Sequence, residues 1–190
     1  MPLYIGTTGH RPDKIGGYGD NNLAKYLRLE FRRILRILKG LSKEPLILNS
    51  GMALGWDTYA VSAAIVEDIP FRAIVPFKGQ ERVWPETSQR IYRNALTYAQ
   101  EVVICSEIVP TDKHTATRLL LERDQRIVDE SNVMVACWNG SKGGTAHTVK
   151  LTNAAKVPLL IIDPNDVISL GKGRTETEIA EWFKNAFNRK

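Results

Sequence analysis

The sequence predicts an α/β fold, a Rossmann-like three-layer α/β/α sandwich with a mainly parallel sheet of about six strands. Short runs rich in Ile and Val alternate with amphipathic helical stretches along the chain. These short runs are almost continuously apolar, which is typical of parallel strands that helices cover on both faces. The 190 residues are 43% hydrophobic and 25% charged, values typical of globular proteins. Because single domains commonly hold about 100–200 residues, we expect residues 1–190 to form one domain.

The expected elements alternate from the first strand to the last helix. The strands are predicted, in order, at Leu3–Gly6, Pro45–Asn49, Phe71–Val75, Glu101–Cys105, Val133–Trp138 and Pro158–Asp163, where the apolar runs lie. The helices are predicted near 21–40, 55–68, 87–99, 115–131, 144–155 and 176–188, where amphipathic stretches connect these runs. The spacing of Thr175 and Glu178 is that of a capping box, which introduces the last helix. This order implies right-handed crossovers in a doubly wound sheet.

The first predicted helix carries much of the positive charge. The chain has 26 Lys and Arg against 21 Asp and Glu, a formal net charge of +5. Five cations on this helix lie three or four residues apart and so share one face: Lys25, Arg28, Arg32, Arg36 and Lys39. We favour a solvated outer face for this cationic stripe. The alternative is a surface that docks RNA, DNA or protein, although no aromatic residues for base stacking are interleaved with it.

The sequence favours a cytoplasmic protein without a membrane partner. Met1 is followed almost at once by a strand-like run rather than by a secretory leader, and no apolar stretch approaches 18 residues. Cys105 and Cys137 each lie inside an apolar run, which favours two buried, reduced thiols over a disulfide bridge. The three histidines lack the spacing of zinc ligands, so we expect neither a metal site nor a required cofactor.

Small, polar and aromatic residues collect where the predicted strands end. They lie in the segments Thr7–Pro12 with Gly16–Gly19, Ser50–Asp57, Pro76–Pro85 and Asn139–Thr145. In open α/β sheets, ligands bind beyond the carboxyl ends of the strands. We therefore expect these segments to line one binding site.

Two of these segments have the features of an anion-binding turn. Ser50–Asp57 connects a strand to a helix with glycines at both ends of a tight turn, and Gly143-Gly144-Thr145 opens a later helix in a similar way. Backbone N–H groups at such helix starts can approach a phosphate closely. Neither segment matches the dinucleotide fingerprint or the Walker A sequence, which disfavours a nicotinamide dehydrogenase and a P-loop ATPase. The alternatives are glycines needed only for turn geometry, and an Asp57 that only complements the helix dipole.

Neighbouring side chains add charge and flat apolar surface. Arg11 can bind a phosphate through its guanidinium fork, and His10 can act as a hydrogen-bond donor or as a general acid–base group. Phe77 and Trp84 flank Gln80-Glu81, a combination suited to a ribose or a purine. The alternatives are a surface turn for His10 and Arg11, and a Trp84 that packs onto the core.

Taken together, these motifs resemble the YpsA-like branch of the SLOG superfamily. The similarity covers about residues 3–163 and rests on four motifs in order: Thr8–Pro12 with Gly16–Tyr18, Ser50–Asp57, Pro76–Glu81 with Trp84-Pro85, and Trp138–Gly140 with Gly143–Thr145. The superfamily also includes DprA and the phosphoribohydrolases related to Lonely Guy and lysine-decarboxylase-like proteins. Its members have Rossmann-like folds that bind nucleotides or nucleotide derivatives, so the resemblance implies a nucleotide-like ligand.

The resemblance also implies which residues bind this ligand. They are Gly9, His10, Arg11, Ser50, Gly51, Met52, Ala53, Gly55, Asp57, Gln80, Glu81, Gly143, Gly144 and Thr145. Arg123 resembles the arginine that approaches the pocket in related proteins. The chain departs from the Lonely Guy pattern, in which a catalytic glutamate soon follows the glycine-rich turn, because Ala146 and His147 follow Thr145.

We therefore expect a protein that binds a nucleotide or a nucleotide derivative, of the NAD or ADP-ribose type, as a sensor, a sequestering protein or a regulator. One alternative is a nucleotide-processing hydrolase in which Glu81 or Asp57 acts as the general base or stabilises a ribosyl centre, with help from His10. A second alternative is a DprA-like protein that binds single-stranded nucleic acid through the cationic stripe. A homo-oligomer is compatible with each of them.

Overall fold

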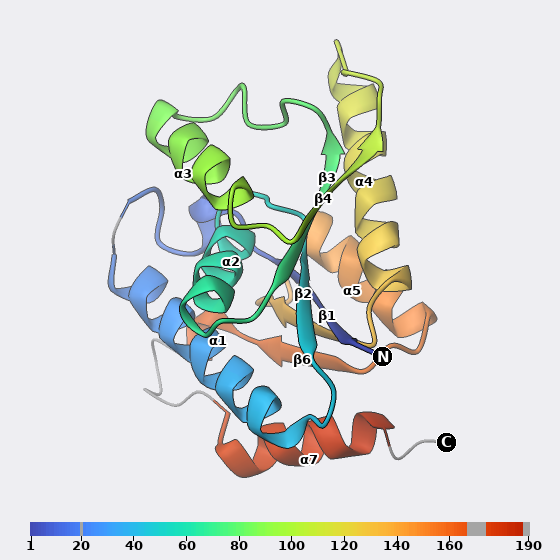
Figure 1. Ribbon diagram of the computed structural model, residues 1–190. Helices are drawn as coiled ribbons and strands as arrows, with labels where there is room; N and C mark the ends of the chain where they lie inside the picture. The colour runs from blue at the N-terminus through green and yellow to red at the C-terminus, as the bar shows by residue number, and fades with distance from the viewer. Residues whose placement is uncertain (20, 167–173, 188–190) are drawn as a thin grey trace.

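The computed structural model describes residues 1–19, 21–166 and 174–187. Six strands form one sheet in the order β4-β3-β2-β1-β5-β6 (Figure 1). Their bounds are β1 Leu3–Gly9, β2 Leu46–Ser50, β3 Phe71–Phe77, β4 Glu101–Ser106, β5 Val133–Cys137 and β6 Leu159–Ile162. Every neighbouring pair is parallel, which confirms the predicted Rossmann-like fold with its parallel sheet.

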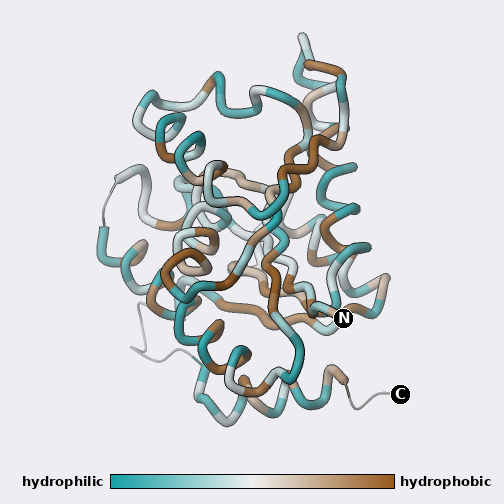
Figure 2. Tube along the Cα trace, in the orientation of Figure 1, coloured by the Kyte–Doolittle hydropathy of each residue, from teal (hydrophilic) through white to brown (hydrophobic). Residues whose placement is uncertain are grey.

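Helices cover both faces of this sheet. The helices are α1 Asn22–Leu41, α2 Trp56–Val66, α3 Glu86–Leu96, α4 Lys113–Asp129, α5 Gly144–Ala154 and α7 Glu176–Phe187, with a short 3₁₀ turn, η1, at Pro12–Lys14. One hydrophobic cluster joins the sheet to α1, α2 and α7, and another joins its opposite face to α4 and α5. Figure 2 shows the hydrophobic segments concentrated on the strands and on the inward sides of these helices.

The direction in which the chain winds reverses at the centre of the sheet. From β1 the chain proceeds through β2 and β3 to β4 at one edge, and α4 then returns it to β5 on the other side of β1. The boundary between β1 and β5 is therefore the topological switch point, where open α/β sheets bind their ligands.

The amphipathic pattern of α1 explains its place on the sheet. Asn21 caps its start by accepting a hydrogen bond from the backbone N of Ala24 at 2.8 Å. The apolar face buries Leu27, Phe31 and neighbouring residues, and the Phe31 ring meets the edge of Trp56 with 5.1 Å between the ring centroids. The indole N of Trp56 in turn donates to Thr7 Oγ1 at 2.6 Å, which ties α2 to β1.

Two strands continue beyond their predicted ends. β1 was predicted to end at Gly6, but Thr7, Thr8 and Gly9 still pair with β5, so the strand ends at Gly9. β3 was predicted to end at Val75 and ends at Phe77, which pairs with Ser106 of β4. Polar residues and a proline mark a strand end in a sequence, but a paired neighbouring strand supplies the hydrogen bonds that extend it.

The helix ends are decided by local hydrogen bonds. α3 was predicted to reach residue 99 and ends at Leu96, because tight turns at Thr97 and Tyr98 replace the helical bonds. α4 begins at Lys113, two residues before its predicted start, because the Asp112 side chain accepts from the backbone N of Thr115 at 2.8 Å. The predicted capping box before α7 is present in full: Glu178 accepts from the backbone N of Thr175, and Thr175 Oγ1 accepts from that of Glu178. Residue 188, the predicted end of this helix, lies outside the described residues.

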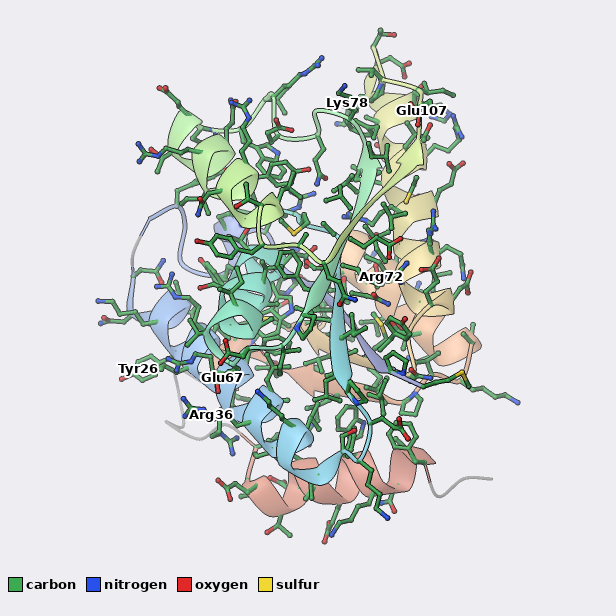
Figure 3. The ribbon with its side chains drawn as sticks, viewed as in Figure 1. Tyr26, Arg36, Glu67, Arg72, Lys78 and Glu107 are labelled. Carbon is green, nitrogen blue, oxygen red and sulfur yellow. The ribbon has the colours of Figure 1, made fainter. Side chains whose placement is uncertain are left out.

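The cationic stripe of α1 runs beside the end of α2 and contacts Glu67 there. Arg32 and Arg36 each donate to a different oxygen of the Glu67 carboxylate, at 2.8 and 2.7 Å. Lys39 donates to the Glu67 carbonyl at 2.7 Å, and the Arg28 guanidinium lies 5.3 Å above the Tyr59 ring. Figure 3 labels Arg36 and Glu67, whose side chains point toward each other. Lys25, Arg36 and Lys39 are exposed to solvent, as expected for a solvated outer face, and Glu67 binds three of the five cations.

The state of the two cysteine thiols was also predicted from the sequence. Both thiols are free: Cys137 is buried in β5, whereas Cys105 on the edge strand β4 is only half-buried. Burial raises the pKa of the Cys137 thiol far above its usual range.

None of the helices in the described part of the chain combines the length and the apolar character needed to cross a bilayer.

Candidate functional site

A cavity of about 180 Å³ lies at the topological switch point, beyond the carboxyl end of β1. Four segments line it: the end of β1 with the residues that follow it, the turn before α2, the first half of α4 and the start of α5. The lining residues are Thr7, Thr8, Gly9, Arg11, Ala53, Asp57, Thr117, Leu120, Leu121, Arg123, Asp124, Gly144 and Thr145. The cavity therefore contains two arginines and two aspartates in a small volume.

Asp57 is the buried carboxylate of this cavity. It lies in the first turn of α2, is 6% exposed, and accepts a hydrogen bond from the backbone N of Ala53 at 3.2 Å. Burial disfavours its ionised form and raises its pKa to about 6, even though Arg123, the Ala53 N–H and Arg11 act in the opposite direction. Asp57 can therefore exchange a proton near neutral pH, which suits a hydrogen-bonding or an acid–base role.

Arg123 connects α4 to the turn that follows β2. Its side chain is almost wholly buried and donates to the carbonyl of Gly51 through Nη1, and to Asp124 Oδ1 through Nε at 2.8 Å. Asp124 also accepts from Thr148 Oγ1 at 3.2 Å, which connects α4 to α5. Gly51 is required by this arrangement, because a Cβ atom at that position would overlap the Arg123 guanidinium.

Arg11 is the exposed cation of the cavity. It follows β1 at the mouth, where solvent reaches its side chain. The surrounding protein atoms partly desolvate the guanidinium and lower its pKa, while Asp57 acts in the opposite direction. An arginine remains charged under these conditions, so Arg11 offers a cation that a ligand can reach directly.

The start of α5 offers backbone donors to the same space. Gly144 opens the helix and lines the cavity together with Thr145. Nothing lies within 4 Å of a Cβ atom built on Gly144, so the backbone here is open to a close approach. At the start of α2, by contrast, Gly55 is in close contact with protein: its φ is +91°, and a Cβ atom there would lie 2.5 Å from the carbonyl oxygen of His10. The start of α5 is thus the more accessible of the two predicted anion-binding turns.

His10 lies outside the cavity lining. Its ring is 3% exposed, and Nε2 lies 2.7 Å from Asn139 Oδ1 and 3.1 Å from the Asn139 backbone N. Burial lowers the pKa of this imidazole, which favours its neutral form. His10 therefore joins the segment after β1 to the segment after β5, a structural role that the sequence pattern did not reveal.

Gln80, Glu81 and Trp84 likewise lie outside the cavity. Gln80 donates to the Gly51 carbonyl at 3.3 Å, so it supports the same carbonyl that binds Arg123. Glu81 accepts from Arg93 at 3.2 Å, and the Trp84 ring meets the edge of Tyr92 at 5.3 Å. The segment after β3 therefore turns toward α3.

The other predicted binding residues divide into those that line the cavity and those that do not. Gly9, Arg11, Ala53, Asp57, Arg123, Gly144 and Thr145 line the cavity, while Phe77, Ser50, Gly51, Met52, Gly55 and Gly143 do not. Ser50 accepts from the backbone N of Met52 at 3.2 Å, and Met52 is buried with a φ of 56°. This turn supports the cavity from behind.

Sequence reasoning missed the contribution of α4. Thr117, Leu120, Leu121 and Asp124 line the cavity at helical spacing, whereas the sequence had indicated only Arg123 on this helix. The available signal was topological, since a helix that returns from an edge strand to the centre must cross the switch point.

The chain matches a known protein family over most of its length. Residues 27–188 match the family described as DNA recombination-mediator protein A. The chain belongs to this family. The predicted relationship to DprA is confirmed, and the YpsA-like branch stays a prediction. Over 81 residues, the chain is 29% identical to the uncharacterized SPbeta prophage-derived protein YoqJ of Bacillus subtilis (strain 168), a match that covers 38% of the chain and 46% of YoqJ.

Solved structures share the fold of the chain at low sequence identity. DNA processing protein A from Helicobacter pylori, described for its single-stranded DNA binding mode, has a TM-score of 0.63 at 16% identity, over 97% of this chain and 81% of that one. DprA from Streptococcus pneumoniae has a TM-score of 0.61 at 15% identity, and the chain spans 56% of its length. The Moco carrier protein of Chlamydomonas rheinhardtii has a TM-score of 0.54 at 16% identity, with both chains covered in full.

Proposed function

We propose that this protein binds a phosphate-bearing nucleotide or nucleotide derivative in the cavity at the switch point, and acts as a cytoplasmic sensor, sequestering protein or regulator of the YpsA-like type. The observation that carries the proposal is the convergence of Arg11, Arg123 and the open start of α5 on the same small cavity as Asp57. Cationic groups and carboxylates therefore line the same small space.

The division of charge favours a ligand with two kinds of polar group. Arg11 and the backbone N–H groups at Gly144 and Thr145 would bind a phosphate. Asp57 and Asp124 would repel a bare phosphate, but they accept hydrogen bonds from hydroxyl groups. A ribose beside a phosphate carries both groups, so a ribose phosphate unit fits this lining better than an isolated anion.

A titration series tests this proposal. AMP, ADP and ADP-ribose are added to the wild type and to Arg11→Ala, and binding is followed by calorimetry and by thermal shift. A ligand at a hundred times its Kd should stabilise the wild type by about 2.7 kcal/mol. Arg11→Ala should weaken binding by about tenfold or more, since a charge-assisted contact contributes roughly 1.5–3 kcal/mol. Arg90→Ala, which changes an exposed arginine on α3 outside the cavity lining, serves as the control. Absence of binding across the series would overturn the proposal.

Single-stranded DNA binding is a second candidate, favoured by membership of the recombination-mediator A family and by the H. pylori neighbour. A groove that neutralises several phosphates gives a steep salt dependence, with a slope of about −0.7 per phosphate for single strands. A dT oligonucleotide titrated at increasing salt therefore separates the two candidates. If the affinity for the dT oligonucleotide falls steeply with salt and AMP does not displace the oligonucleotide, DNA binding is favoured over nucleotide binding.

Turnover of the ligand is a third candidate, and it would depend on Asp57. Of the three catalytic candidates, only Asp57 lies in the cavity, and its pKa of about 6 suits a general acid or base. Chromatography of AMP and ADP-ribose after incubation with the wild type and with Asp57→Asn tests for hydrolysis.

A further inference from the structure

A second hollow, of about 480 Å³, lies beside the cavity on the α1, α2 and α3 side of the sheet. The glycine-rich segment between β1 and α1 forms its rim, where Tyr18 is 64% exposed. Tyr59 of α2, Leu54 and Ile91 of α3 supply apolar surface, and Ser62 supplies a hydroxyl. We call this space the aromatic hollow.

The aromatic hollow and the cavity share one thin wall. Consecutive residues line the two spaces: Arg11 lines the cavity and Pro12 the hollow, and Ala53 lines the cavity while Leu54 lines the hollow. The wall is the close backbone contact between these two segments, where the backbone N of Trp56 donates to the His10 carbonyl at 3.1 Å. Arg11, at the mouth of the cavity, stands at this boundary.

The cavity alone is too small for a whole nucleotide. Small-molecule sites commonly measure about 300–1,000 Å³, whereas this cavity measures about 180 Å³. A ribose phosphate unit bound in it leaves the rest of a nucleotide outside, so that part must lie in an adjoining space.

The lining of the aromatic hollow suits a planar base. Tyr18 and Tyr59 are aromatic, and the Arg28 guanidinium lies over the Tyr59 ring, which adds a flat cationic surface. Bases stack on such aromatic and guanidinium planes. Another neighbouring hollow meets the cavity at Thr117 and Leu121, but no Tyr, Phe or Trp lines it, and its Arg118 already pairs with Glu122 at 2.6 Å.

We propose that the aromatic hollow binds the base of a nucleoside phosphate whose ribose phosphate unit occupies the cavity. This inference rests on the proposed function and adds a specific prediction: recognition of the ligand extends across Arg11 to Tyr18. The phosphate contacts supply charge recognition, and the hollow supplies stacking, which tolerates different bases because each has an aromatic face.

The test compares AMP and GMP with ribose 5-phosphate, which lacks the base, by calorimetry on the full chain. The wild type should bind both nucleotides about 5- to 150-fold more tightly than ribose 5-phosphate, the range that corresponds to roughly 1–3 kcal/mol for stacking of one base on an aromatic residue. Tyr18→Ala should remove most of this difference and leave the affinity for ribose 5-phosphate unchanged. Tyr26→Ala is the matched control, because Tyr26 is a 58% exposed tyrosine on α1 that does not line the hollow (Figure 3).

The outcomes separate this inference from the proposed function. If the nucleotides and ribose 5-phosphate bind with equal affinity, the base site is wrong and the phosphate site stands. The base site is also wrong if Tyr18→Ala and Tyr26→Ala weaken nucleotide binding equally. If none of the three ligands binds, the proposed function fails, and the base site fails with it.

Discussion

The two ends of α2 carry one carboxylate each, and arginines approach both. Asp57 lies in the first turn, near Arg11 and Arg123, and burial raises its pKa to about 6. Glu67 follows the last turn, where Arg36 and Arg32 donate to it and lower its pKa. The same pairing of charges therefore has opposite outcomes at the two ends of one helix.

The difference shows that the surroundings of a carboxylate decide the effect of its partners. Arg36 is 61% exposed, and the hydrogen bonds that Arg36 and Arg32 donate outweigh the partial desolvation of Glu67. At the other end, Asp57 is enclosed by the cavity wall, and the loss of hydration outweighs two nearby cations. A buried carboxylate kept close to its titration range is an expensive feature that a purely structural helix end does not need.

The largest loss of stability is expected when Arg123, which lies at the cavity end of α2, is replaced. Arg123→Ala leaves the Gly51 carbonyl and Asp124 without their buried partner, so we expect a loss of about 3–5 kcal/mol in the free energy of unfolding. Arg126→Ala, one helical turn further along α4, removes a half-exposed pair with Glu130 and should cost about 0.5 kcal/mol. Urea unfolding of both variants measures the contrast, and equal losses would contradict the structural role assigned to Arg123.

The stability of the two helix ends should depend on pH with opposite signs. Because the folded-state pKa of Asp57 is raised from 3.8 to about 6, the folded protein binds more protons than the unfolded chain between these values. The contribution of Asp57 is complete below about pH 4 and is lost as the pH rises through 6. Relative to the wild type, Asp57→Asn should therefore gain up to about 3 kcal/mol in unfolding free energy between pH 4 and pH 7.

Glu67→Gln provides the opposite case. The lowered pKa of Glu67 means that its contribution is present above the ordinary glutamate pKa and is lost as the pH falls. Relative to the wild type, Glu67→Gln should become less stable as the pH rises through that range, by less than about 1 kcal/mol because solvent reaches its partner Arg36. Chemical unfolding at several pH values gives both slopes. Slopes of the same sign would show that burial does not distinguish the two ends.

The fold could be predicted from the sequence because the apolar runs themselves indicate where the strands lie. Val133–Cys137 is buried at every position, and continuous apolar character is the signal that a central parallel strand leaves in a sequence. The strand-end motifs also identified Arg11, Asp57 and Gly144 as residues of one edge, because the carboxyl ends of parallel strands meet there.

The partners of individual side chains could not be predicted in the same way. Glu81 pairs with Arg93, and Trp84 meets Tyr92, because the segment after β3 turns toward α3; neither a charge nor an aromatic ring indicates that direction. His10 contacts Asn139, 129 residues away, and the cationic stripe meets Glu67 on another helix. Spacing along a helix predicts which residues share a face, but tertiary packing decides what covers that face.

The smallest effect on stability is expected from replacement of Arg36, beside the last turn of α2. Arg36→Ala leaves Glu67 paired with Arg32, so the unfolding free energy should fall only slightly, and the small loss should shrink further in high salt. If the stripe instead bound single-stranded DNA, the same substitution would reduce the salt slope of dT binding by about 0.7, the contribution of one phosphate contact. We expect the slope to stay unchanged, because Glu67 already engages the Arg36 guanidinium that a phosphate would need. A reduced slope with unchanged stability would show that this cation serves nucleic acid rather than the end of α2.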